Sequence, residues 1–168
     1  MTVKLVSHIL ATGILTIALA SLTSCEEQKI YHAYAHSERT VWDKGDAFLF
    51  MVPPMKSEGT YLLEADLRIT REYPYTGLTL IIDQTVIHTH NSLLPHSPSL
   101  HHADTLSCRL AESDGNTLGK GINFLQYEFP VRHMELKKGD SLVIGIRHYM
   151  KQETLPGVSD IGISIKSL

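Results

Sequence analysis

The sequence predicts an all-β protein, an antiparallel β-sandwich of about eight strands wired as a jelly roll or another Greek key. Residues 59–70 carry the clearest signal, because apolar and polar side chains alternate along them with the period of a strand. Short segments rich in β-branched residues are separated by turns that contain glycine or proline. Beyond the first 24 residues, no segment shows the apolar stripe of an amphipathic helix.

Four expected strands lie in the first half of the chain. They cover residues 30–35, 47–52, 59–70 and 78–90. The second is an apolar run that Pro53 and Pro54 end. The third should have one face buried and one face in water. The fourth is rich in β-branched residues and forms either one long strand or a hairpin broken near Asp83.

Four more strands follow a loop. They cover residues 104–110, 122–129, 142–150 and 158–166. The loop, residues 91–103, contains two prolines, three serines and three histidines, and loops of this length are usually functional or mobile. Cys108 lies on the same strand face as two leucines and is expected to be a buried core residue. Pro130 should end the strand 122–129.

The N-terminal segment has the features of a bacterial export signal. A basic start at Lys4 precedes the apolar run 9–20, which is too short to span a membrane. The run closes with Leu22-Thr23-Ser24-Cys25, which resembles the lipobox of bacterial lipoproteins. Residues 1–24 are therefore expected to be removed, and Cys25 is expected to carry the lipid.

Composition and length indicate one exported domain. Removal of residues 1–24 leaves 144 of the 168 residues, with 14 Lys and Arg against 18 Asp and Glu. This acidic balance is not the basic footprint of a nucleic-acid-binding protein. We expect a lipidated tether at 25–29, a β-sandwich domain at 30–168, and no cofactor.

Histidines suggest one alternative function. His88 and His90 share one face of an expected strand, a spacing that lets two imidazoles hold one metal ion, and His101 or His102 could supply a third ligand. The corresponding function is that of a metal-dependent envelope enzyme. The other interpretation is that these histidines lie exposed on an edge strand.

Aromatic residues suggest another alternative, a surface carbohydrate-binding module. Trp42 is the single tryptophan, and Tyr73-Pro74-Tyr75 forms a bend between strands. Their rings could form a stacking platform for a sugar or a partner. Equally, Trp42 could close one end of the sandwich core.

Several motifs, in order along the mature chain, resemble the gliding motility lipoprotein GldH family of the Bacteroidetes. They are the lipobox, Trp42-Asp43-Lys44, Arg68 with Tyr73-Pro74-Tyr75 and Leu78, Asp104-Thr105, Leu110-Ala111, Leu118-Gly119-Lys120-Gly121, Tyr127-Glu128, and 155–162. The resemblance implies a noncatalytic lipoprotein of the outer membrane that acts with other envelope lipoproteins in gliding motility and the associated type IX secretion machinery. It brings no catalytic residues. A contact surface containing Trp42, Tyr73, Pro74, Tyr75 and Lys120 is the expectation that follows.

Overall fold

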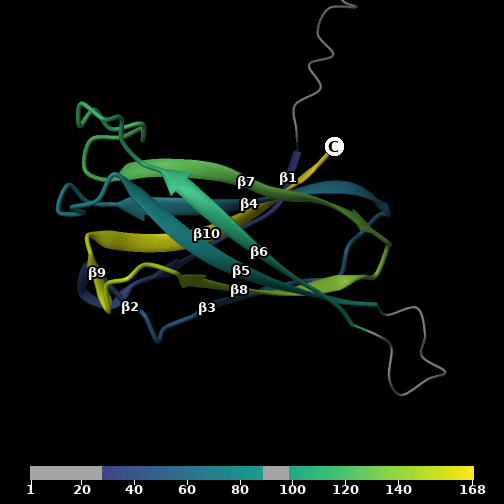
Figure 1. Ribbon diagram of the computed structural model, residues 1–168. Helices are drawn as coiled ribbons and strands as arrows, with labels where there is room; N and C mark the ends of the chain where they lie inside the picture. Colours follow the sequence, from purple (N-terminus) through teal and green to yellow (C-terminus); the bar gives the residue numbers. More distant parts are fainter. Residues whose placement is uncertain (1–27, 89–98) are drawn as a thin grey trace, which may run out of the picture.

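Two antiparallel sheets of four strands each pack face to face in the computed structural model, which describes residues 28–88 and 99–168 (Figure 1). The strands are β1 (Gln28–His36), β2 (Val41–Asp43), β3 (Phe48–Val52), β4 (Gly59–Ile69), β5 (Gly77–Ile87), β6 (Leu100–Arg109), β7 (Leu125–Leu136), β8 (Ser141–His148), β9 (Thr154–Pro156) and β10 (Val158–Ser167). A short 3-10 helix, η1 (Glu38–Thr40), follows β1.

The strand order is that of a jelly roll. One sheet has the order β1-β10-β4-β7, and the other has the order β3-β8-β5-β6. When the eight long strands are numbered in chain order, these sheets read 1-8-3-6 and 2-7-4-5, the wiring of two nested Greek keys. The predicted fold class is therefore confirmed. The short strands β2 and β9 pair with each other and were not expected.

The core lies between the two inner sheet faces and follows the period of two. The buried side chains of the four central strands include Leu63, Leu67, Leu80, Ile82, Ile144, Ile146, Ile161, Ile163 and Ile165. Each alternates with a side chain on the outer face of its sheet, because successive residues of a strand point to opposite faces. The alternation in the sequence therefore determines which side chains of each sheet face the core.

The expected element boundaries differ from the structure most clearly in β7 and β6. β7 begins at Leu125 rather than at residue 122, and it does not stop at Pro130 but continues to Leu136, because it is an edge strand whose register shifts beside this proline. β5 is one unbroken strand, which is one of its two expected forms, since Asp83 pairs with both neighbouring strands. The last residues of the predicted loop, from Leu100, belong to β6.

The N-terminal expectations fall largely outside the described residues. β1 begins at Gln28, so the last two residues of the expected tether belong to the sheet. The predicted signal segment, residues 1–24, and Cys25 lie outside the described residues. Over residues 28–88 and 99–168, no helix is long and apolar enough to cross a lipid bilayer.

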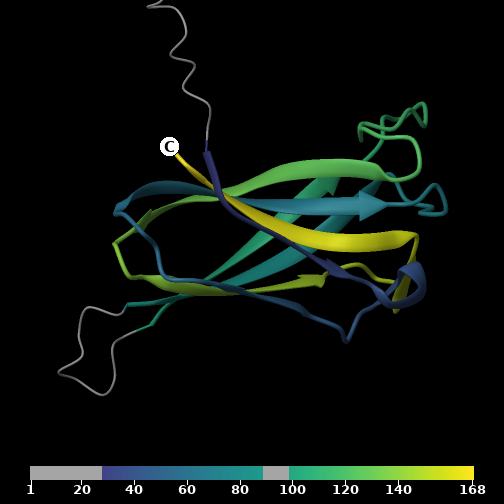
Figure 2. The same cartoon turned by 180° about the vertical axis from the view of Figure 1, so that it is seen from behind.

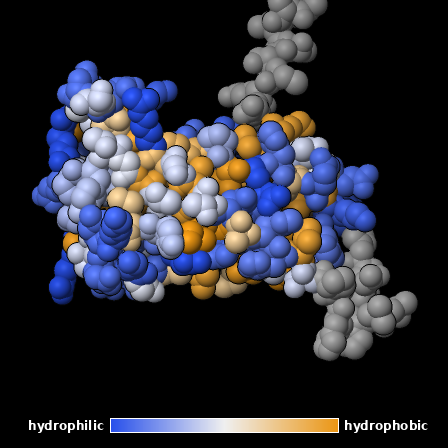
Figure 3. All heavy atoms as spheres, in the orientation of Figure 1, coloured by the Kyte–Doolittle hydropathy of each residue, from blue (hydrophilic) through white to orange (hydrophobic). Residues whose placement is uncertain are grey.

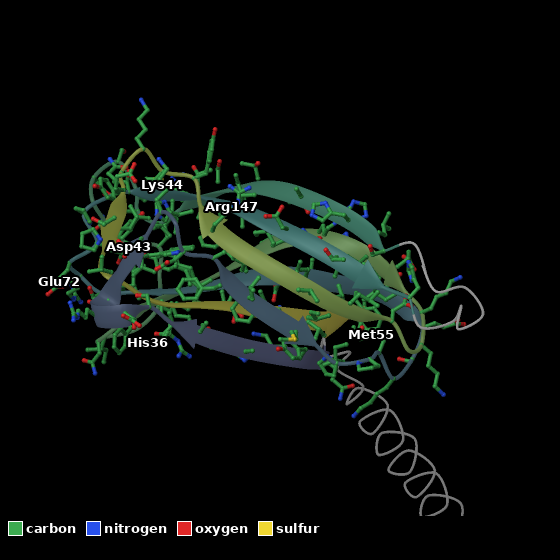
Figure 4. The ribbon with its side chains drawn as sticks, turned by 90° about the horizontal axis from the view of Figure 1, so that it is seen from below. His36, Asp43, Lys44, Met55, Glu72 and Arg147 are labelled. Carbon is green, nitrogen blue, oxygen red and sulfur yellow. The ribbon has the colours of Figure 1, made fainter. Side chains whose placement is uncertain are left out.

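The sandwich has two ends, which carry different loops. We call the end that contains the start of β1 the proximal end. It also contains the end of β10 and loops 53–58 and 137–140 (Figure 2). The distal end contains η1 and loops 70–76, 110–124 and 149–157. Figure 4 shows His36, Asp43, Lys44 and Glu72 at the distal end and Met55 at the proximal end.

Candidate functional site

Most of the motifs that carry the family resemblance lie at the distal end. They come from β2, the bend before β5, the segment after β6, and the β9–β10 turn. Asp104-Thr105 instead lies in the middle of β6, and the lipobox lies outside the described residues. Backbone hydrogen bonds join them: Gly157 N–H donates to Thr40 O at 2.8 Å, and Thr70 N–H donates to Gly157 O at 2.7 Å. Leu110 N–H donates to Thr76 O at 2.9 Å, which links the bend to the segment after β6. The distal end is therefore one continuous surface.

Trp42 closes the core at this end and has no exposed surface. It pairs with Leu155 across β2 and β9, and its indole N–H donates to Asp46 O at 3.1 Å. Its ring contacts Phe48 and His148, with centroids 5.2 Å apart in each case. The expectation that Trp42 forms a surface platform is thus corrected: its ring is covered by the β2–β9 pair, as the interpretation of Trp42 as a core cap requires.

The Tyr73-Pro74-Tyr75 bend is fixed by one buried tyrosine. The Tyr73 hydroxyl donates to Gly77 O at 3.0 Å, and burial raises the pKa of this phenol. Gly157 packs directly against the bend with φ of +84°, and a Cβ there would lie 2.4 Å from Tyr73 N. Tyr73 is therefore a buried support rather than a contact residue. Pro74 is exposed and Tyr75 is half-buried.

Pro74 and Tyr75 line a hollow of about 500 Å³ beside the start of β5. The Tyr75 ring meets Tyr73 edge-on, with centroids 5.5 Å apart. Met150 and Thr79 also line the hollow. Of the expected aromatic platform, only Tyr75 retains an accessible ring, so the carbohydrate-binding alternative loses its stacking surface.

Lys120 lies on a segment held against β7. Its backbone pairs with Gln126 in both directions, at 3.1 and 2.9 Å. Gly119 allows the close approach, because a Cβ there would lie 2.5 Å from the Tyr127 ring. The Tyr127 hydroxyl donates to Leu110 O at 3.0 Å and so ties β7 to the segment after β6. The Lys120 side chain is exposed.

A groove of about 640 Å³ runs beside Lys120. Arg109, Leu118 and Phe129 are among its lining residues. The following loop presents large apolar side chains to solvent, with Ile122 86% exposed and Phe124 46% exposed. Figure 3 shows hydrophobic residues over the middle of the face in view, whereas mostly hydrophilic residues cover its two ends. Exposed apolar groups beside a cation suit contact with another macromolecule, and sequence periodicity could not identify them because the segment is a loop.

The turn at η1 adds strained backbone to the same end. Arg39 and Thr40 both have φ of 54°, which is unfavourable for a residue with a Cβ and most of all for a β-branched one. The turn is held by Ser37, whose N–H donates to Ser159 O at 2.9 Å and whose hydroxyl donates to Val158 O. The Arg39 side chain is exposed at the distal end.

The histidines do not assemble a metal site in the part of the chain that the structure describes. His88 lies at the proximal end, and its Nδ1 is 3.0 Å from Asp140 Oδ1. His101 Nε2 is 3.9 Å from Asp83 Oδ1 on the outer face of the β3-β8-β5-β6 sheet. His90 lies outside the described residues. Within residues 28–88 and 99–168, no three His, Cys, Asp or Glu side chains are grouped to hold a metal ion.

A polar cluster on the outer face of the β1-β10-β4-β7 sheet was missed. The alternation in β4 predicted a face in water, but the Asp66 side chain has 0% exposure. His32 Nε2 lies 3.2 Å from Asp66 Oδ2. The Arg68 guanidinium lies 3.8 Å from the centroid of the Tyr34 ring, which covers Gly162. These side chains reach across β10 because its outward residues there, Gly162 and Ser164, are small.

Asp66 is electrostatically unusual. Burial raises the pKa of its carboxyl to about 6, against an opposing effect of His32. The His32 distance satisfies an ion pair, yet neither carboxylate oxygen accepts a well-directed hydrogen bond from the described residues. Burial and the Asp66 charge also raise the pKa of Tyr34 to about 12. No spacing in the sequence brings His32 and Asp66 together.

Comparison with known proteins identifies the family. Residues 29–165 match the family model described as GldH lipoprotein. The chain is 25% identical over 162 residues to the gliding motility lipoprotein GldH of Flavobacterium johnsoniae, covering 92% of this chain and 95% of that protein.

Among solved structures, an aminopeptidase from a marine sediment archaeon aligns with a TM-score of 0.37 and 10% identity, over 86% of this chain and 32% of its own. The Eiger TNF of S. frugiperda aligns with a TM-score of 0.23 and 14% identity, over 82% of this chain and 92% of its own. The match to the family model covers most of the domain, and the chain therefore belongs to the GldH lipoprotein family.

Proposed function

We propose that this protein is a noncatalytic lipoprotein of the outer membrane, anchored through Cys25, that serves gliding motility and the associated type IX secretion machinery. It works by contact between its distal end and other envelope lipoproteins or secretion components. Family membership and the name of the Flavobacterium relative support the cellular role. The position of most of the family motifs at one end of the sandwich supports the mode of action.

The distal end has the chemistry of a contact surface. Its exposed apolar residues include Leu118, Ile122 and Phe124, and the cation of Lys120 lies beside them. Apolar side chains on a rigid frame give affinity, and a charged rim gives orientation to the partner. The frame is rigid because hydrogen bonds from Tyr127 and Leu110 hold the segment to both sheets.

Complementation of a deletion strain tests the proposal. We expect the wild-type gene to restore surface spreading and type IX secretion, and Ile122→Asp with Lys120→Glu not to restore them. Leu49→Asp is the matched control, because Leu49 is also a largely exposed apolar residue but lies on the outer face of the other sheet. Full rescue by the distal variant at wild-type protein levels would contradict the proposal.

The anchor is tested separately. Labelled fatty acid should appear on the wild-type protein and be absent from Cys25→Ser, because the thiol is the lipid acceptor in this interpretation. The variant should leave the membrane fraction, since lipid chains supply stable attachment. Label that remains on Cys25→Ser would place the lipid elsewhere.

A further inference from the structure

The proximal end lies within a short distance of the anchoring residue. β1 begins at Gln28, three residues after Cys25. Three residues span at most about 11 Å even when fully extended. The end of the sandwich at which β1 starts is therefore confined to the lipid surface when Cys25 carries lipid, while the long strands place the distal end roughly 30 Å further away.

The two loops at this end form a rigid, lysine-bearing platform. Met55 N–H donates to Asp140 O, and Gly139 N–H donates to Met55 O, both at 2.8 Å. The buried Asp140 carboxylate also accepts from Lys137 N–H at 2.9 Å and contacts His88. This network fixes the loops that carry three exposed lysines: Lys56, Lys137 and Lys138.

Lysines outnumber exposed carboxylates on the proximal loops. Glu58 is the exposed carboxylate on loops 53–58 and 137–140, because Asp140 is buried in the network. The proximal loops thus present an excess of positive charge, which is complementary to anionic lipid headgroups.

A hollow beside the start of β1 adds apolar surface to the lysines. Its volume is about 370 Å³, and Ile30, Pro53, Pro54 and Lys56 are among its lining residues. The Tyr31 hydroxyl donates to Met51 O at 3.3 Å and so joins β1 to the end of β3 beside this hollow. Ile30 and Met51 are themselves largely exposed. Apolar side chains next to lysines are the composition of surfaces that lie at a membrane interface.

We propose that the proximal end is a lipid-docking surface, on which Lys56, Lys137 and Lys138 contact anionic headgroups while Ile30 and Met51 enter the interface. This inference rests on the proposed anchor at Cys25. Docking would give the anchored domain a fixed orientation, with the distal surface held away from the membrane. It adds a specific orientation to the role proposed above.

The experiment uses the lipidated full-length protein in vesicles of phosphatidylcholine, with and without 30% phosphatidylglycerol. A fluorophore is attached at Pro53→Cys or, as the distal control, at Ser113→Cys; both positions are exposed, and Cys108 is buried. Quenching by a spin-labelled headgroup is expected to be at least threefold stronger at position 53. Phosphatidylglycerol should increase it, and high salt should reduce it.

Charge variants complete the test. Replacement of Lys56, Lys137 and Lys138 by Gln should abolish the effect of phosphatidylglycerol on quenching at position 53. Replacement of Lys44, Lys120 and Lys151, the matched set at the distal end, should leave it unchanged. In the Cys25→Ser protein, partitioning to anionic vesicles should fall about fivefold for each proximal lysine removed.

Equal quenching at positions 53 and 113 in the attached protein, or stronger quenching at 113, would overturn the docking surface. These outcomes are distinct from failure of the anchor, which is read from fatty-acid labelling. They are also distinct from failure of the cellular role, which is read from complementation.

Discussion

Asp66 shows how a single carboxylate can oppose the stability of the fold. Its side chain is covered by residues that reach over β10, so the charged form is poorly solvated, and His32 compensates only in part. Three buried polar atoms in this cluster, Tyr34 Oη and both Asp66 carboxylate oxygens, find no hydrogen-bond partner among the described residues. Such clusters often mark sites under functional constraint.

Asp66→Asn is expected to stabilise the protein at alkaline pH. Because the folded-state pKa of about 6 exceeds the ordinary value of 3.8, the stability due to this group is fully present below 3.8 and is lost as pH rises through about 6. Asparagine keeps the shape and removes the buried charge. At pH 8 we expect a gain of about 1 to 3 kcal/mol in the free energy of unfolding, and little change at pH 4.

Urea unfolding at both pH values measures this effect, with His32→Gln as the companion variant. That variant removes the side chain that partly offsets the burial of the Asp66 carboxylate, so it should be less stable than the wild-type protein. A lower stability of Asp66→Asn at pH 8 would mean that the His32 pair fully compensates the buried charge.

Cys108 is expected to be unreactive in the folded protein. It is 3% exposed, and burial raises the pKa of its thiol to about 12, so the nucleophilic thiolate is scarce at neutral pH. Native Cys25→Ser protein, in which Cys108 is the remaining thiol, should not react with Ellman's reagent at pH 8, whereas the unfolded variant should react at once. Rapid reaction without denaturant would show that β6, the edge strand that carries Cys108, separates locally from β5.

Among the elements, the β9–β10 turn is critical because two bends of the distal end pack onto it. Gly157→Ala would require φ of +84° from alanine and would place a Cβ 2.4 Å from Tyr73 N. We expect a loss of about 1 to 3 kcal/mol in unfolding free energy. Gly45→Ala is the matched control, since a Cβ there meets no atom within 4 Å, and it should change stability by less than about 0.5 kcal/mol.

Thermal denaturation of the two variants provides the comparison. A Gly157→Ala protein as stable as Gly45→Ala would mean that the turn rearranges without cost. If Gly157→Ala is less stable, complementation with this variant must be measured at a temperature at which it is folded.

The strands could be predicted from the sequence where one physical rule determined them. Alternation located β4 and β10, and the apolar run located β3, because inner and outer residues must alternate in a sandwich. Pro130 misled the prediction, since proline is tolerated in an edge strand beside a bulge and edge status is not visible in one sequence. β2 and β9 are too short to produce a periodic signal.

The candidate site was only partly predictable, for a related reason. Lys120 and Tyr75 are accessible as expected, but Trp42 and Tyr73 are buried, and an aromatic residue near a turn carries no mark of its orientation. The exposed Ile122 and Phe124 looked like ordinary strand residues. The Asp66 cluster depends on contacts between β1 and β4 across β10, which only the sheet order reveals.

At the scale of the whole molecule, the single tryptophan reports on the complete fold. Trp42 joins the short β2–β9 pair to the end of the core, so its environment depends on both sheets. We expect the urea transitions followed by Trp42 emission and by far-UV circular dichroism to coincide, as in a two-state domain. A tryptophan transition at lower urea would show that the distal end unfolds as a separate unit.

The position of β1 determines how the domain would respond to tension. It pairs with β10 from Gln28 opposite Ser167 to His36 opposite Asp160, and Lys29 Nζ also contacts Glu128 on the far edge strand at 2.9 Å. Ladder hydrogen bonds lie perpendicular to the strands, so a pull along β1 from the lipid, resisted by a partner at the other end, loads the whole ladder in shear. All the bonds must then yield together rather than one after another, which makes the lipid-linked strand a mechanically strong point of attachment.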